Sequence, residues 1–250
     1  MTGIEAKRWI VFSALSILFL ALVSWMGLWE SVLRFFFPGE AQVLYPRTTL
    51  LILVWEHIQL VALSSALTIL VGIPLGILVT RPGGKDFLPI VNDLTSFGQT
   101  IPPVAILALA VPMLGFGFLP TVVALFIYGL LPVVRNTIAG LNAVSGSLLD
   151  AASGMGMSRV QSLFRIELPI AVPVIMAGIR ISVIINIGTA MVGAVIGAGG
   201  LGSPIIAGLV QYNVAYVIEG ALPAAFLAVL ADFLLSTIER AMMPVASAAG

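Results

Sequence analysis

Residues 150–169 combine the side chains best suited to binding another protein. The segment starts with a carboxylate and two small residues, contains two glycines, and carries apolar side chains among its polar ones. The residues that stand out are Asp150, Ala151, Ala152, Gly154, Gly156 and Met157. A carboxylate forms charge-assisted hydrogen bonds, and small residues let a partner approach closely. We predict two short helices, broken near the glycines, with an apolar edge that docks on another protein.

A second set of polar residues recurs at helical spacing inside apolar stretches. The set consists of Ser64, Asn92, Ser96, Gln99, Thr100, Asn186 and Thr189. Spacings of three and four residues place side chains on one face of a helix. We hypothesise that these faces line a translocation cavity. The sequence leaves one alternative open, which is hydrogen bonding between helices, worth about 0.6 kcal/mol per bond on average.

No residue set predicts catalysis, a bound cofactor or a metal site in this chain. The chain has no cysteine and one histidine, which argues against thiolate and histidine metal sites. Residues 83–85 (Gly-Gly-Lys) look like part of a phosphate-binding loop, but Asp86 stands where Ser or Thr is required. The glycines within 197–202 follow an uncharged stretch of membrane-span length, which excludes a dinucleotide fold.

Composition places these residues in a membrane protein. Hydrophobic residues make up 60% of the 250-residue chain and charged residues only 9%, and the mean hydropathy is +1.16. A span needs about 20 apolar residues, and only helices satisfy their own backbone hydrogen bonds in hydrocarbon. The formal net charge of zero gives no sign of nucleic-acid binding. We therefore predict an all-α, polytopic transmembrane bundle embedded in the lipid bilayer.

The uncharged stretches predict six spans, at 9–28, 58–80, 87–114, 119–138, 170–196 and 220–238. The glycine-rich segment after the fifth span is predicted to be a re-entrant or external loop. Most basic residues then fall on one side, namely Lys7, Arg8, Arg81, Lys85, Arg135, Arg159, Arg165 and Arg240. This bias predicts that both termini and the 150–169 segment are cytoplasmic. We divide the chain into an N-terminal anchor with an external segment (1–56) and a core transmembrane domain (57–250).

The segment Asp150-Ala-Ala, with Gly156 and then Ile166-Glu-Leu-Pro169, resembles the EAA loop of permease subunits of binding-protein-dependent ABC importers. In this chain the loop spans 139–172. Most members begin the motif with glutamate, and Asp150 is shorter by one methylene. Further segments are similar to permeases for osmoprotectants such as glycine betaine, carnitine and choline, namely 57–60, 72–76, 99–102, 131–136 and 197–202.

This resemblance implies the type I permease fold of ABC importers, in the cytoplasmic (inner) membrane. It implies that the loop is a coupling helix that docks on two partner ATPase subunits, which bind ATP and Mg²⁺ and hydrolyse the ATP. It further implies a second permease copy or paralogue and a separate extracytoplasmic substrate-binding protein. The chain itself is then a transporter subunit and not an enzyme.

Two alternatives remain open at this point. Permeases for methionine, taurine or nitrate share parts of the same patterns. An ion-coupled secondary transporter would use Asp93, Glu219 and Asp232 as coupling groups, because ionisable residues at membrane depth are expensive and functional. We expect Glu219 at the external edge, and either aspartate to be satisfied by snorkelling or by a partner such as Arg135.

Overall fold

The computed structural model describes residues 3–242, which are helical and contain no strand. The α-helices are α1 (Gly3–Ser24), α2 (Met26–Phe36), α3 (Leu50–Thr80), α4 (Leu88–Thr100), α5 (Pro103–Leu114), α6 (Phe118–Asn142), α7 (Gly146–Gly154), α8 (Arg159–Ser162), α9 (Leu168–Ala190), α10 (Gly202–Gln211) and α11 (Val214–Met242). Single turns join some of them, namely the 3₁₀ turns η1 (Lys85–Phe87) and η3 (Met191–Ile196) and the π turn η2 (Leu163–Glu167).

Length and composition confirm the predicted bundle of about six spans. Five segments are long and apolar enough to cross a membrane, and the bent pair α4–α5 is a candidate for a sixth. Two spans start earlier than expected, because α3 begins at Leu50 and α11 at Val214. The predicted domain boundary at residue 56 therefore falls inside α3, so one continuous helix joins the two predicted parts.

The span predicted at 87–114 is not one straight helix. Its two halves, α4 and α5, meet at an angle of 97°. The break lies at Ile101 and Pro102, and a second proline, Pro103, starts α5. Proline lacks the N–H that would bond to the preceding turn, and it drives the residue before it away from helical angles. Two consecutive prolines therefore end α4 inside the apolar stretch.

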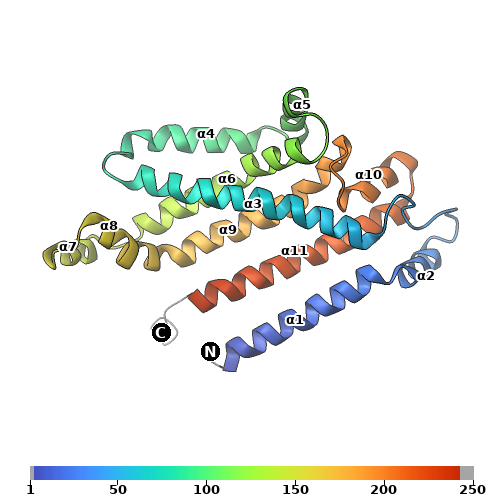
Figure 1. Cartoon of the computed structure of the whole chain (residues 1–250), viewed down its shortest axis with the longest axis horizontal. Coiled ribbons are helices and arrows are strands. Elements are labelled where there is room, and N and C mark those ends of the chain that lie inside the picture. The colour runs from blue at the N-terminus through green and yellow to red at the C-terminus, as the bar shows by residue number, and fades with distance from the viewer. Residues whose placement is uncertain (1–2, 243–250) are drawn as a thin grey trace.

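The long helices lie side by side in one elongated bundle (Figure 1). Helix α6 packs between α3 and α9, while α11 packs on α9 and α1 on α11. Helix α4 packs on α6 at the opposite edge of the bundle from α1 (Figure 1). The pair α7–α8 extends beyond one end of the bundle, while α2 and α10 lie at the other end. The start of α1 and the end of α11 lie toward the α7–α8 end.

Small residues let the central helices approach closely. A Cβ added to Gly72 would lie 2.9 Å from Val133 Cγ1, and one added to Gly76 would lie 2.7 Å from Thr137 Cβ. Gly72 and Gly76 therefore let α3 and α6 approach closely. On α9, Gly178 lies against α6, where an added Cβ would be 2.7 Å from the carbonyl oxygen of Pro132.

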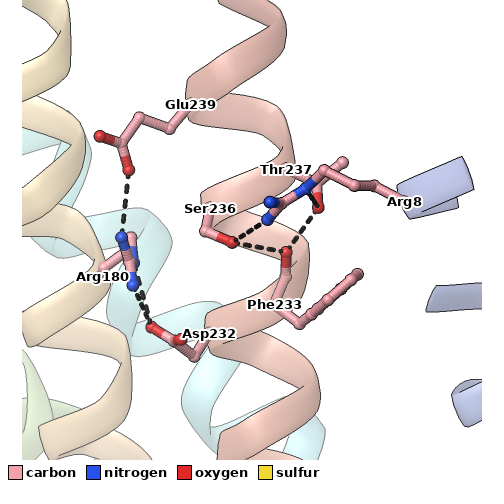
Figure 2. Close-up of polar contacts among 7 residues, drawn as sticks. All are labelled: Arg8, Arg180, Asp232, Phe233, Ser236, Thr237 and Glu239. Carbon is pink, nitrogen blue, oxygen red and sulfur yellow. Dashed lines mark hydrogen bonds and ion pairs between the residues drawn. The ribbon is translucent and has the colours of Figure 1, made fainter. Parts of the chain in front are cut away.

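Charged side chains join the outer helices near the ends of α1 and α11. Arg180 of α9 forms ion pairs with Asp232 at 2.7 Å and Glu239 at 3.2 Å (Figure 2). Arg8 of α1 donates to Ser236 Oγ and lies over the Phe233 ring, 5.1 Å from its centroid (Figure 2). For Asp232 the sequence left snorkelling or a partner such as Arg135 open, and the structure gives Arg180 as the partner because α9 packs against α11.

Replacing Gly178 by alanine should destabilise the bundle by about 1–3 kcal/mol, since the added methyl overpacks a backbone carbonyl that cannot move independently. The loss should appear as a lower thermal midpoint of the purified protein in detergent. Gly188→Ala, on the same helix with open space around its Cα, is the matched control and should leave the midpoint unchanged or raise it. Equal midpoints for both variants would contradict the close α6–α9 contact.

Candidate functional site

The 150–169 segment forms two short helices, as predicted. Helix α7 ends in a hydrogen-bonded motif in which Met157 N–H donates to Ala152 O at 3.0 Å and Gly156 N–H donates to Ser153 O at 2.9 Å. Gly156 has φ +79°, a left-handed angle that glycine adopts without a Cβ penalty. These two bonds and the left-handed residue make a Schellman-type helix end. The break near Gly154 and Gly156 is thus confirmed, and glycine is required there by conformation.

The predicted docking residues occupy different environments. Asp150 and Ala151 are exposed, as are Gly154 and Gly156, whereas Ala152 is 1% exposed and Met157 is half-buried. The segment also exposes large apolar side chains, namely Leu148, Met155, Val160 and Phe164. Because α7 and α8 project beyond the bundle (Figure 1), this apolar edge is available to a partner. Contiguous exposed apolar groups rimmed by polar ones are typical of interaction surfaces.

A cavity of about 400 Å³ separates α7 and α8 from the end of α3. An ion pair lies in its wall, with Arg81 Nη2 2.8 Å from Glu167 Oε2. Glu167 is buried, and it belongs to the π turn η2 that leads from the loop into α9. This pair was not predicted from the sequence. A signal for it was present, since Glu167 is a lone carboxylate at the apolar start of a span and Arg81 belongs to a basic turn. A buried charge requires a partner, and the basic turn supplies one.

Two of the polar residues predicted on α4 are bonded to α6. Gln99 Nε2 donates to Tyr128 O at 2.7 Å, and Arg135 Nη2 donates to Ser96 Oγ at 3.0 Å. Asn92 and Ser96 are half-buried, and Thr100 is exposed beside the break. The Tyr128 hydroxyl donates to the carbonyl of Ile101 in the break itself. These contacts hold the end of α4 on α6 while leaving one side of α4 open.

Ser64 and Asn186 lie together where α3, α6 and α9 meet. Asn186 Nδ2 is 3.4 Å from Ser64 Oγ and 3.3 Å from Ser65 Oγ, and Ser64 and Asn186 are fully buried. Gly129 of α6 closes over them, since an added Cβ would lie 2.5 Å from Ser182 Oγ. The structure therefore brings Ser64 and Asn186 together as a bond between α3 and α9. It does not join them to the α4 set, and Thr189 is half-buried further along α9.

Two partly buried polar contacts lie at the other end of the bundle. Gly200 N–H donates to Glu56 Oε2 at 2.8 Å, in a turn where Gly197, Gly199 and Gly200 all have positive φ. Glu219 accepts the N–H of Tyr45 at 2.7 Å and is fully buried beneath the 37–49 segment. Across residues 3–242, no group of three histidine, aspartate or glutamate side chains is placed to hold a metal.

Residues 72–244 match the protein family described as binding-protein-dependent transport system inner membrane component. The chain belongs to this family. It is a permease subunit of the inner membrane and works with ATPase and substrate-binding partners. The predicted resemblance to ABC importer permeases is therefore confirmed, and the chain functions as a transport component and not as an enzyme.

Named relatives extend over most of the permease. It is 40% identical over 244 residues to the osmoprotectant import permease protein OsmY of Salmonella typhimurium, covering 98% of this chain and 99% of OsmY. It is 43% identical over 192 residues to the choline transport system permease protein OpuBB of Bacillus subtilis, covering 76% and 87%. The glycine betaine/carnitine/choline permease OpuCB of Bacillus subtilis is 41% identical over 191 residues, covering 76% and 86%.

A solved structure shows the same fold. The permease superimposes on a chain of the inward-facing MetNI methionine ABC transporter with a TM-score of 0.69 and 24% identity, covering 78% of this chain and 96% of that one. At this identity the likeness shows the fold alone. The predicted ABC importer permease fold is thereby confirmed.

Breaking the Arg81–Glu167 pair should destabilise the permease by about 1–3 kcal/mol, less than for a fully buried pair because Arg81 is partly exposed. The variant is Glu167→Gln, and thermal unfolding in detergent is the measurement. Exchanging the charges with Arg81→Glu and Glu167→Arg together should recover much of the loss. Glu30→Gln, which breaks the exposed Glu30–Arg34 pair, is the control and should change stability by less than about 1 kcal/mol. Similar losses for Glu167→Gln and Glu30→Gln would contradict the structural role of the buried pair.

Proposed function

We propose that this permease moves a small osmoprotectant, such as glycine betaine, carnitine or choline, inward across the cytoplasmic membrane. The transport is driven by ATP hydrolysis in partner subunits. The observation that carries the proposal is the α7–α8 loop, with Asp150 and Ala151 exposed, an apolar edge, and a glycine-terminated helix. The names of OsmY, OpuBB and OpuCB support the solute class.

In the proposed complex, two ATPase subunits each receive one coupling loop. The loop residues are Asp150, Ala151, Ala152, Gly154, Gly156 and Met157. Asp150 supplies charge-assisted bonds and Ala151 permits close approach, while the buried Ala152 and the left-handed, exposed Gly156 fix the shape of the helix end. ATP and Mg²⁺ bind to the ATPases, because Asp86 in this chain replaces the residue that would hold magnesium in a phosphate loop.

The proposed orientation places the loop and both termini in the cytoplasm. The excess of basic residues at that end of the bundle supports it. A second copy or a paralogue completes the pathway, and a separate substrate-binding protein delivers the solute from the other side. We propose that Asn92, Ser96, Gln99, Thr100 and Thr189 face the pathway. The enclosed Ser64 and Asn186 hold α3 against α9 beside it.

The docking of the loop can be tested by Asp150→Lys in the complex reconstituted with its ATPase and binding protein. Reversing this charge should weaken ATPase binding at least about tenfold and abolish ATP-driven uptake. The cationic group of the ATPase that bonds to Asp150 would then face a second positive charge. Asp150→Glu restores the carboxylate and should retain uptake. Asp86→Lys reverses an exposed carboxylate outside the loop and is the matched control.

Two outcomes would overturn the proposal. The first is normal uptake by Asp150→Lys together with unchanged ATPase binding. The second is uptake by this chain alone under a proton or sodium gradient, which would identify an ion-coupled transporter.

A further inference from the structure

Two opposite charges lie on neighbouring helices without forming an ion pair. Asp93 of α4 and Arg135 of α6 are both exposed, and neither belongs to any ion pair within residues 3–242. The Arg135 side chain nevertheless reaches α4 close to Asp93. Arg135 Nη2 donates to Ser96 Oγ at 3.0 Å, and Ser96 lies three residues after Asp93 on the same helix. Residues three apart are neighbours on a helix surface.

Both charges lie in apolar helices, where an unpaired charge facing lipid would be costly. Elsewhere in the chain, a charge that joins two helices is paired with opposite charges. Arg180 is matched by Asp232 and Glu239 on the facing helix (Figure 2). Asp93 and Arg135 lack such a match. An aqueous space beside this face, or a ligand that carries both opposite charges, would satisfy them.

The break after α4 supports an aqueous space beside this face. Irregular backbone at membrane depth occurs where it is buried in protein or lines a cavity, and interrupted helices in transporters mark solute sites. Pro102 and Pro103 have no N–H, so the start of α5 loses two of the donors that would make a helix N-terminus attractive to anions. The C-terminal carbonyls of α4 remain, and they favour a cation.

An aromatic ring completes the cation-favouring side. Phe97 is 63% exposed and lies one turn after Asp93 on α4. A carboxylate and an aromatic face one turn apart suit a quaternary ammonium group, which binds by charge and by cation–π attraction. On the other side, the guanidinium of Arg135 suits a carboxylate, which it can bind with two parallel hydrogen bonds.

We infer that the face formed by Asp93, Phe97 and Arg135 is a solute-binding site for a small zwitterion that carries a quaternary ammonium group and a carboxylate. The ammonium group lies by Asp93 and Phe97, and the carboxylate binds Arg135. In the proposed complex the solute bridges Asp93 and Arg135. The inference rests on the proposed function and assigns its residues: Arg135 distinguishes carboxylate-bearing solutes from choline, which has no carboxylate.

The uptake test uses the complex reconstituted with its ATPase and binding protein, with glycine betaine and choline as separate solutes. Arg135→Gln should raise KM for glycine betaine at least about tenfold and leave choline within about twofold, whereas Asp93→Asn should raise KM for both. Arg135→Lys and Asp93→Glu keep the charges and should restore most of the uptake. Arg34→Gln, a cation in an exposed external pair, is the control and should change neither KM. Equal effects of Arg135→Gln on the two solutes would overturn the inference.

A labelling test separates this inference from the proposed function, because it needs no transported solute. The chain has no cysteine, so Thr100→Cys places a single thiol beside the break, on the face of Asp93. In the assembled complex, a trimethylammonium methanethiosulfonate should modify it at least about fivefold faster than the sulfonate analogue, and adding Asp93→Asn should remove that preference. No modification by either reagent, or a preference unaffected by Asp93→Asn, would overturn the site even if uptake proceeds. Normal labelling without osmoprotectant uptake would overturn the proposed solute class alone.

Discussion

Hydrocarbon provides no water to a charged or polar group, so every such group in the spans needs a partner in the protein or an aqueous space. This constraint organises the permease from end to end. Glu219 is enclosed with the N–H of Tyr45, and His57 Nε2 lies 3.0 Å from the carbonyl of Ile187. Each of these contacts joins segments far apart in the sequence, so the groups that are costly to bury also determine how the helices assemble.

Hydropathy predicted the spans well because length and apolar composition are local properties. It did not predict the α4–α5 bend, for a reason visible elsewhere in the chain. Single prolines lie inside long helices at Pro74, Pro132, Pro173 and Pro223 without interrupting them. A proline in an apolar stretch is therefore a weak sign of a break, and only the consecutive pair at 102 and 103 ends the helix.

The break between α7 and α8 was also predictable, because the left-handed Gly156 acts within a few residues, as does the capping box between Ser158 and Gln161. The polar stripes were not. Spacing placed Ser64 and Asn186 on helix faces, but only the packing of α3, α6 and α9 decides that these faces meet each other. Glu167 was missed similarly, since its partner lies in a turn far away in sequence. Residues whose role depends on one distant partner are beyond pattern analysis of a single chain.

The way the α7–α8 segment is built has a mechanical consequence. Helix α7 is closed by two hydrogen bonds, α8 opens on a capping box, and η2 continues without interruption into α9. The chain is thus helical without a break from α8 through η2 into α9. The few residues between α7 and α8 are the place where this segment can bend most easily. A force applied at α8 would therefore reach the long helix directly, whereas a force applied at α7 would first pass through the joint that contains Gly156.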